Sequence, residues 1–286
     1  MEFNYYCPNN LDQLFEDMKQ DDQYALIAGG TDLMVKMKRK LCQPKNVIDL
    51  KNLQELKGIE ALDGQIRIGA MATHTELENS SLIQDKADIV SEAARYVGST
   101  QIRNIATVGG NIGNASPAAD TVPPLLVLNG QAILCSEEGN EQVPLVDLFA
   151  GPGKLNLKKG QIIQSILIDC VKENEGTAFM KFGKRKALAI SVINGAVWIK
   201  LDGNKIVQAR IAFGSMAATP IRMKEVEGFL VGQEVSDAVF EKAAQLAMDQ
   251  LKPIDDIRSS AEYRKNIAGT IIKKGFAVAA NKARGV

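Results

Sequence analysis

Two glycine pairs, each followed by small polar side chains, constrain the fold more than any other feature of this chain. Gly29-Gly30 precedes Thr31 and Asp32, and Gly109-Gly110 precedes Asn111. Adjacent glycines tolerate positive φ angles and bring consecutive N–H groups close to a ligand, and a helix that begins behind the first pair favours a phosphate. Two interpretations remain open from the pattern alone: loops that hold a phosphate-bearing cofactor, or ordinary tight turns.

The common nucleotide-binding motifs do not fit these loops. Neither pair has the spacing G-x-G-x-x-G of a Rossmann fingerprint. The stretch Gly151-Pro152-Gly153-Lys154 is followed by Leu155, where a P-loop needs Ser or Thr to reach magnesium. A phosphate site in this chain would therefore belong to a different fold.

Hydrophobic patterns predict a small α/β unit at residues 1–52. The apolar stretch 25–28 indicates a buried strand before the first glycine pair, and 47–50 indicates a second strand. Thr31 and Asp32 are expected to cap a helix that crosses over between these two strands.

A second unit with a mixed sheet is expected at 53–172. The segment 107–120 fits no regular element, and Asp120 is expected to cap a short helix with Pro123 in its first turn. A charged stretch, 172–176, is the best linker candidate. The regular elements expected here are strands at 65–69, 131–135 and 161–168 and one helix at 81–96.

The remaining chain, 176–286, is expected to form a three-stranded sheet followed by a helical bundle. Asp202-Gly203-Asn204 is a hairpin signal between two long strand patterns. Sheet followed by helices makes the whole chain α+β. The strands are expected at 177–182, 190–201 and 205–214, and the helices at 222–232, 236–250 and 260–282.

Composition excludes several kinds of site. The 34 Lys and Arg residues balance 34 Asp and Glu, which disfavours nucleic-acid binding, and the only histidine is His74. Sites with two imidazole ligands are excluded, and the four cysteines have no C-x-x-C spacing for zinc or an iron–sulfur cluster. No stretch is long and apolar enough for a membrane span, and no signal peptide is recognised. We therefore expect a cytoplasmic protein with reduced cysteines and no membrane contact.

Three motifs, in order, resemble the FAD-binding (medium) subunit of the molybdenum hydroxylases, the xanthine dehydrogenase and carbon monoxide dehydrogenase family. They lie at 28–33, 101–111 and 115–120, and 151–154 and 181–186 extend the likeness. The resemblance implies a PCMH-type FAD-binding fold at 1–172, with subdomains at about 1–52 and 53–172. It also implies a C-terminal CO-dehydrogenase-flavoprotein-like domain at 176–286.

Positions that match the family's flavin contacts are implied to bind FAD noncovalently. The first loop is implied to hold the diphosphate, Asp120 to lie beside the adenosine, Ile163 to form an apolar wall and Lys181 to lie near the flavin ring. The family often has an aromatic residue where this chain has Val97, next to Tyr96. The matching positions are Leu26, Ile27, Ala28, Gly29, Gly30, Thr31, Asp32, Leu33, Val97, Thr107, Gly109, Gly110, Asn111, Asp120, Ile163 and Lys181.

Several of these residues also have a purely structural interpretation. Lys181 could belong to an exposed basic run, and Asp120 could serve only as a helix N-cap. Arg103 is expected to pin the following loop through backbone hydrogen bonds rather than bind a partner. His74 is expected to have a structural or surface role. The basic residues 36–40 are expected to coat the exposed end of the first helix.

The resemblance implies two partner subunits, a large one with molybdopterin and a small one with two [2Fe–2S] clusters. Electrons are expected to pass from those clusters through FAD to NAD+ or another acceptor. The segment 187–191 is more similar to the purine and nicotinate branch, which favours a xanthine-type N-heterocycle as substrate. Two alternatives remain: a self-contained PCMH-type flavin oxidoreductase, and an assembly module of the same fold without flavin.

Overall fold

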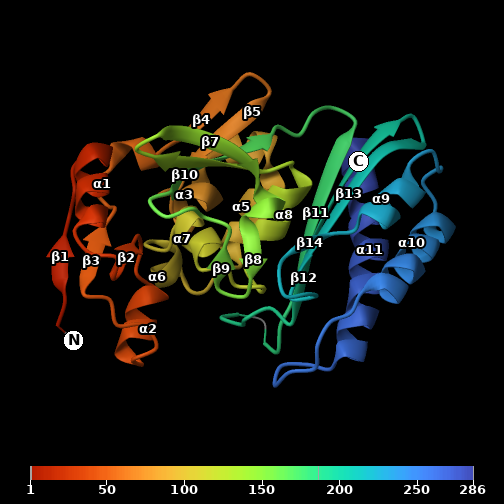
Figure 1. The fold of residues 1–286 in the computed structure, drawn as a ribbon. Helices are drawn as coiled ribbons and strands as arrows, with labels where there is room; N and C mark the ends of the chain where they lie inside the picture. The colour runs from red at the N-terminus through yellow and green to blue at the C-terminus, as the bar shows by residue number, and fades with distance from the viewer. Residues whose placement is uncertain (1, 186, 286) are drawn as a thin grey trace.

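The chain is built from three consecutive units, which Figure 1 shows from left to right in chain order. A computed structural model describes residues 2–185 and 187–285. The red and orange N-terminal unit lies at one side, the central unit in the middle, and the green and blue C-terminal unit at the other side. None of the helices described is long and apolar enough to cross a membrane.

The N-terminal unit has a parallel three-stranded sheet in the order β1-β3-β2, one strand more than expected. The extra strand, β1 (Asn4–Tyr6), is short and largely exposed, so it lacks a hydrophobic pattern, but its backbone pairs with residues 46–48. The helix α1 packs Leu14, Phe15 and Met18 into the core of this unit. The other elements are α1 (Leu11–Lys19), β2 (Tyr24–Ile27), α2 (Leu33–Lys38), β3 (Asn46–Asp49) and η1 (Gln54–Leu56).

The central unit is a five-stranded sheet, β4-β5-β10-β6-β7, covered by short helices. All of its strand pairs are antiparallel, so it is not the mixed sheet that was expected. Its strands are β4 (Ile59–Leu62), β5 (Gln65–Gly69), β6 (Gln131–Ser136), β7 (Gly139–Pro144) and β10 (Ile162–Asp169), with a small hairpin of β8 (Phe149–Gly151) and β9 (Lys154–Leu155). Its helices are α3 (His74–Asn79), α4 (Ser81–Lys86), α5 (Asp88–Arg95), α6 (Thr100–Arg103), α7 (Val108–Gly113), α8 (Val122–Val127) and η2 (Leu145–Leu148).

Two other predictions for the central unit were also wrong in detail. The helix expected at 81–96 is broken at Ala87, whose φ of −155° and ψ of 46° are not helical. The break is stabilised because the Lys86 carbonyl accepts a hydrogen bond from Val171 N–H, 2.7 Å away, instead of from the next helical turn. The segment 107–120 also contains a regular element, because Thr107 caps the helix α7.

The C-terminal sheet has four strands, β11-β12-β13-β14, rather than the expected three. The fourth is only two residues long, too short to leave a sequence pattern. Helices α9 to α11 occupy the three predicted helical ranges to within a few residues. The elements are β11 (Glu175–Phe182), β12 (Ile193–Asp202), β13 (Lys205–Gly214), β14 (Ile221–Arg222), α9 (Lys224–Leu230), α10 (Asp237–Gln250) and α11 (Ala261–Ala283).

This sheet is covered on both faces, by α5 and α8 on one side and by α10 and α11 on the other (Figure 1). Alternate residues of β12 therefore enter different cores: Trp198 packs with the central unit, and Val197 and Ile199 pack under the C-terminal helices. The expected linker is a tight turn, and β11 begins within it. The domain limits 1–172 and 176–286 stay a prediction.

Candidate functional site

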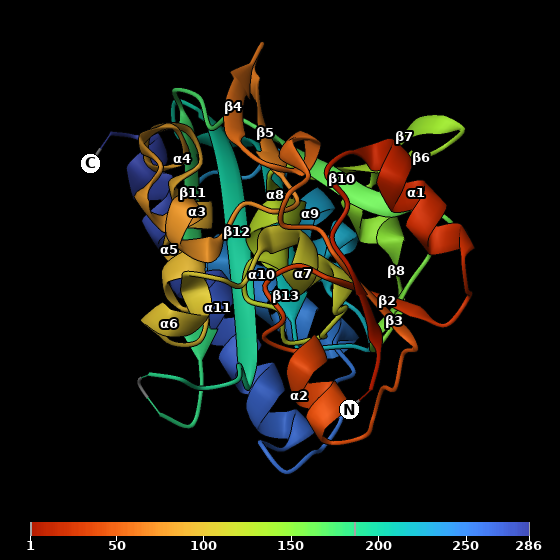
Figure 2. The ribbon, with the colours of Figure 1, turned by 90° about the vertical axis from the view of Figure 1, so that its left-hand side faces the viewer.

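A cavity of about 510 Å³ lies against both glycine loops. Its walls come from the end of β2 and the start of α2, from α7 and the turn before it, and from the region of β9 and β10. Figure 2 views the molecule from the side of the N-terminal unit and shows α2 below α7. The two helices are joined by a hydrogen bond of 2.5 Å from Lys36 Nζ to Asn114 Oδ1. The cavity is thus formed where the N-terminal and central units meet.

The first glycine loop lines this cavity and carries a row of unpaired main-chain donors. Within the described part of the chain, the N–H groups of Gly29 through Leu33 have no hydrogen-bond acceptor. Gly30 has a φ of +70°, which an L side chain rarely adopts. Five consecutive N–H groups at a helix start form an anion-binding nest. Asp32 occupies the N-cap position of α2, but its side chain makes no capping bond.

Gly29 also sets how closely the two loops approach. A Cβ on this residue would lie 1.8 Å from the carbonyl oxygen of Ile105, which precedes the second loop. In the second loop, a Cβ on Gly109 would lie 2.6 Å from atoms of Ala70. The glycines are therefore required for backbone packing as well as for loop conformation.

The second loop does not supply free N–H groups, contrary to the expectation from its glycine pair. Gly109 N–H donates to the Ala70 carbonyl at 2.8 Å, and Gly110 N–H donates to Thr107 Oγ1 at 3.0 Å. Asn111 N–H bonds within α7, and its Oδ1 accepts from Thr121 Oγ1 at 2.9 Å. The group of this loop that is free to bind a ligand in the cavity is the Asn111 side chain, whose Nδ2 has no acceptor among the residues described.

His74 lines the same cavity, which excludes the surface role considered for it. The side chain is fully buried, and neither ring nitrogen has a hydrogen-bond partner among the described residues. Burial and the nearby charge of Arg103 lower the pKa of His74 to about 4, so the ring is neutral at pH 7. The Thr-x-x-Glu pattern at 73–76 indicates the start of α3, but no local signal shows that the next residue faces a cavity.

All of the sequence-predicted contact residues line the cavity except Ile27, Asp120 and Lys181. The side chain of Ile27 lies against Gly30 instead. Residues that were not among the predicted contacts complete the lining. Lys36, one helical turn after Asp32, lines the cavity instead of coating the exposed end of the helix as expected. The polar or large residues of this group are Lys36, Leu50, Met71, His74, Ile102, Asn114, Leu155, Leu157, Gln161 and Ile162.

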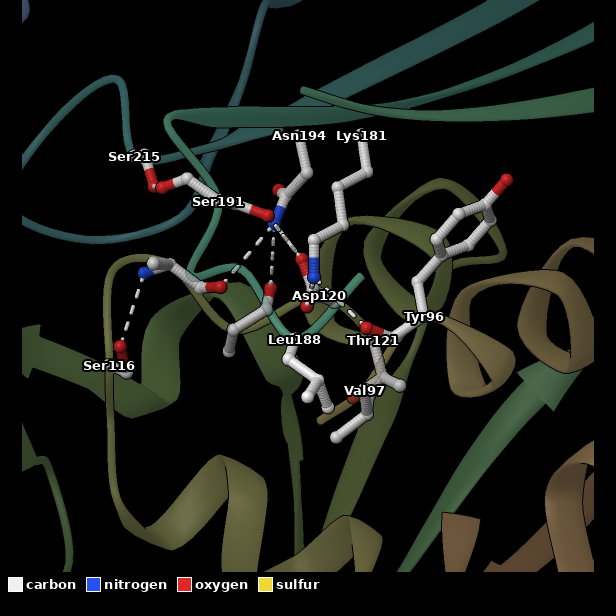
Figure 3. Close-up of polar contacts among 12 residues, drawn as sticks. Tyr96, Val97, Ser116, Asp120, Thr121, Lys181, Leu188, Ser191, Asn194 and Ser215 are labelled. Atoms are coloured by element: carbon white, nitrogen blue, oxygen red, sulfur yellow. Dashed lines mark hydrogen bonds and ion pairs between the residues drawn. The ribbon is translucent and has the colours of Figure 1, made fainter. Parts of the chain in front are cut away.

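Asp120 and Lys181 form a buried ion pair outside the cavity lining (Figure 3). Lys181 Nζ lies 2.6 Å from Asp120 Oδ2 and 3.0 Å from the Tyr96 carbonyl oxygen. The other carboxylate oxygen accepts from Ser191 Oγ at 2.5 Å and from Asn194 Nδ2 at 2.8 Å. Figure 3 shows these donors converging on Asp120 from the C-terminal sheet and from the loop before β12.

Two structural interpretations are corrected by this pair. Lys181 does not belong to an exposed basic run, since only 8% of its side chain is accessible; Lys186, at the end of that run, lies outside the described residues. Asp120 is not the N-cap of α8, because Thr121 holds that position and makes no side-chain capping bond. Both residues remain proposed rather than demonstrated flavin contacts.

Arg103 fixes the turn before it rather than the loop after it. Its Nε pairs with Glu78 Oε2 at 2.9 Å, and its guanidinium also donates to the Val97 carbonyl at 3.4 Å. Val97 lines the cavity, so this contact helps to fix the cavity wall.

Comparison with known proteins identifies the family. Residues 1–168 match the model "FAD binding domain in molybdopterin dehydrogenase", and residues 178–279 match "CO dehydrogenase flavoprotein C-terminal domain". This chain is an FAD-binding subunit of the molybdenum hydroxylase family. The FAD-binding subunit is 34% identical over 281 residues to the nicotinate dehydrogenase FAD-subunit of Eubacterium barkeri, covering 96% of this chain and 95% of the relative.

Other relatives act on different substrates. The FAD-binding subunit is 31% identical to the xanthine dehydrogenase FAD-binding subunit of Escherichia coli O157:H7, over 99% of this chain and 97% of that one. A solved Cu,Mo-CO dehydrogenase superposes with a TM-score of 0.93 at 28% identity, covering 98% of both chains. The predicted fold class is confirmed by this match.

The residues around the cavity fit FAD. The free N–H groups of the first loop suit a diphosphate, which offers only acceptors. Val97, Leu157 and Ile163 provide apolar surface for an aromatic ring, and His74 leaves two ring nitrogens without partners. This mixture of apolar walls and a few polar groups is typical of a cofactor site.

Proposed function

We propose that this subunit holds FAD noncovalently in the cavity and passes electrons from the [2Fe–2S] clusters of a small partner subunit to NAD+ or another acceptor. A large partner subunit with molybdopterin would oxidise the substrate, a purine- or xanthine-type N-heterocycle. The main support is the row of unpaired N–H groups from Gly29 to Leu33, in a chain of this family. The nicotinate and xanthine dehydrogenase relatives support a heterocyclic substrate.

The first loop is assigned the diphosphate in this proposal. Its five N–H groups donate to phosphate oxygens, Thr31 adds a hydroxyl, and the ammonium group of Lys36 adds positive charge on the same side. Bound FAD supplies the exchange between two-electron and one-electron steps. The chain itself orients the cofactor and limits water at the ring through Val97 and Ile163.

The second loop and the buried pair are assigned supporting contacts. Asn111 Nδ2 is the unpaired polar group of the second loop, and the Thr107 hydroxyl, whose oxygen caps α7, still has a proton to donate. Asp120 is proposed beside the adenosine and Lys181 near the flavin ring. Because the two are paired at 2.6 Å, they act on the ring as a dipole rather than as a free cation. The stabilisation of a reduced, anionic ring by Lys181 is correspondingly smaller than an unpaired lysine would give.

The experiment that tests this function starts with FAD titration of the purified full chain. We expect one FAD per chain, and we expect that, after photochemical reduction without oxygen, the flavin is reoxidised by NAD+ with formation of NADH. A chain that takes up no FAD would be a flavin-less assembly module. Flavin reduction by a purine without any partner subunit would indicate a self-contained oxidoreductase. Failure of NAD+ to reoxidise the flavin would show that the acceptor is a molecule other than NAD+.

A further inference from the structure

The imidazole ring of His74, the one histidine of this chain, has no hydrogen-bond partner among the described residues, although it is fully buried. Buried polar groups in proteins are almost always paired with protein or with bound ligand or water. His74 lines the cavity assigned to FAD, and an apolar side chain of similar size would fill the same space without leaving polar atoms unpaired. The imidazole therefore indicates a polar group on the cavity side.

The backbone around His74 is held firmly on both sides. Thr73 and Glu76 form a reciprocal capping box, with Thr73 N–H donating to Glu76 Oε2 at 2.7 Å. His74 N–H donates to the Ala106 carbonyl at 3.0 Å, which ties α3 to the strand-like turn before the second loop. The start of α3 is thus fixed by the capping box and a main-chain hydrogen bond, and the ring nitrogens of His74 do not contribute to it.

The charged groups near the ring do not satisfy it either. Arg103 donates to Glu78 Oε2, and Glu76 accepts from Thr73, so neither carboxylate is bonded to the imidazole. A neutral imidazole carries one N–H donor and one acceptor nitrogen. Such a ring can bond a hydroxyl, a carbonyl or an amide group of a ligand equally well.

We propose that His74 is a positioning residue for the cofactor: one of its ring nitrogens forms a hydrogen bond with a polar atom of the bound flavin nucleotide. This inference rests on the proposed function, since it requires FAD in this cavity. The bond supplements the phosphate contacts of the first loop and fixes the cofactor relative to α3 and the second loop.

Because the chain has one histidine, isotope labelling gives a direct test. In full-length protein labelled with [15N]histidine, the ring nitrogens of His74 are the only side-chain histidine signals. We expect one of them to shift when FAD is added, because that nitrogen gains a hydrogen-bond partner. Titration with FMN and with ADP shows which half of the cofactor carries the atom that bonds the His74 ring. Unchanged ring signals at saturating FAD would overturn the proposal.

Variants add a second readout. We expect His74→Phe to weaken FAD binding by about five- to tenfold, the loss of one hydrogen bond, while His74→Gln restores most of the affinity through its amide. In the cofactor-free protein, His74→Phe should raise the unfolding temperature, because it removes two unpaired buried nitrogens. If His74 had only a structural role, His74→Phe would lower the unfolding temperature of the cofactor-free protein.

The matched control is Leu77→Ala, a buried residue on the same helix that does not line the cavity. This variant should lower the unfolding temperature but leave the affinity for FAD unchanged. Wild-type affinity in His74→Phe would overturn the inference while leaving the proposed function intact. Failure of the wild-type chain to bind FAD would overturn both.

Discussion

At the level of single residues, the cavity combines a row of main-chain donors with a single long cation. Lys36 lies on the helix behind the anion nest, and within the described chain its ammonium group makes one hydrogen bond, to the neutral side chain of Asn114. Its neighbour Lys38 lies on the same helix but is exposed and outside the cavity. Comparing substitutions of these two lysines distinguishes the effect of a charge inside the cavity from the effect of the positive charge of the helix as a whole.

Replacing Lys36 should therefore weaken FAD binding specifically. We expect Lys36→Met to raise the dissociation constant of FAD by about three- to tenfold, because a charge-assisted contact to phosphate is lost. The salt dependence of binding should fall in the same variant. Fluorescence titration at two ionic strengths measures both effects. Lys38→Met should behave like the wild type, and equal losses in both variants would contradict a local role for Lys36.

His74 also makes a pH prediction that is independent of cofactor. Its pKa is lowered from 6.5 to about 4 in the folded chain, by burial and by the charge of Arg103, so the unfolded state binds the extra proton between these values. The contribution of His74 to the free energy of unfolding is fully present above pH 6.5. It falls as the pH drops towards 4, by about 3 kcal/mol in total. Urea unfolding of the cofactor-free chain from pH 7 to pH 4 measures this loss. His74→Gln should remove that part of the pH dependence; an unchanged profile would show that other groups dominate.

At the level of elements, the approach of the two glycine loops decides whether the cavity exists. Gly29 lies against the backbone of Ile105 and Ala106, just before the second loop. Gly113, at the end of α7, also lines the cavity but has open space where a Cβ would be. The same substitution thus has opposite consequences at two positions of one site.

We expect Gly29→Ala to destabilise the chain by about 1–3 kcal/mol and to abolish FAD binding, because the added methyl group would push the loops apart. Gly113→Ala should keep FAD binding and stabilise the chain by up to about 1 kcal/mol, since alanine favours a helix. Denaturant unfolding together with flavin absorbance checks both. Normal flavin content in Gly29→Ala would show that the close approach of the loops is dispensable.

The sequence predicted those features of the elements that depend on local conformation. The glycine loops, the strand before Gly29 and the three C-terminal helices all leave patterns within a few residues, and the positions implied by the family resemblance make up half of the cavity lining. Features that depend on distant partners were missed or misassigned. Asp120 was expected to cap a helix because its partner Lys181 lies 61 positions later, and β1 is a strand only because β3 pairs with it.

At the scale of the whole molecule, the central and C-terminal units share one core and one buried ion pair. Phe179, Ala196 and Trp198 of the C-terminal sheet pack with the helices of the central unit. Asp120 belongs to the segment before α8, and Lys181 to β11, so their pair spans the contact between the two units. The pair therefore couples the wall of the cavity to the sheet behind it.

A double-mutant cycle on Asp120 and Lys181 measures this coupling. Asp120→Asn should destabilise the chain by about 3–5 kcal/mol, because it leaves a buried ammonium group without a counter-charge. Lys181→Met should lower the free energy of unfolding by less, since Ser191 and Asn194 still donate to the carboxylate. The double variant should be more stable than the sum of the single losses predicts, by about 1–3 kcal/mol.

The control is a surface pair of the same length. Lys19 Nζ also lies 2.6 Å from Glu137 Oε1, but the two side chains are 64% and 48% accessible, so the corresponding cycle with Lys19→Met and Glu137→Gln should give a coupling below about 1 kcal/mol. Urea unfolding of all variants, followed by tryptophan fluorescence of Trp198 in the shared core, provides both cycles. If the buried pair gave as little coupling as the surface pair, the two units would be held together by apolar packing alone. The position of Lys181 behind the cavity would then have to be explained by the cofactor rather than by the fold.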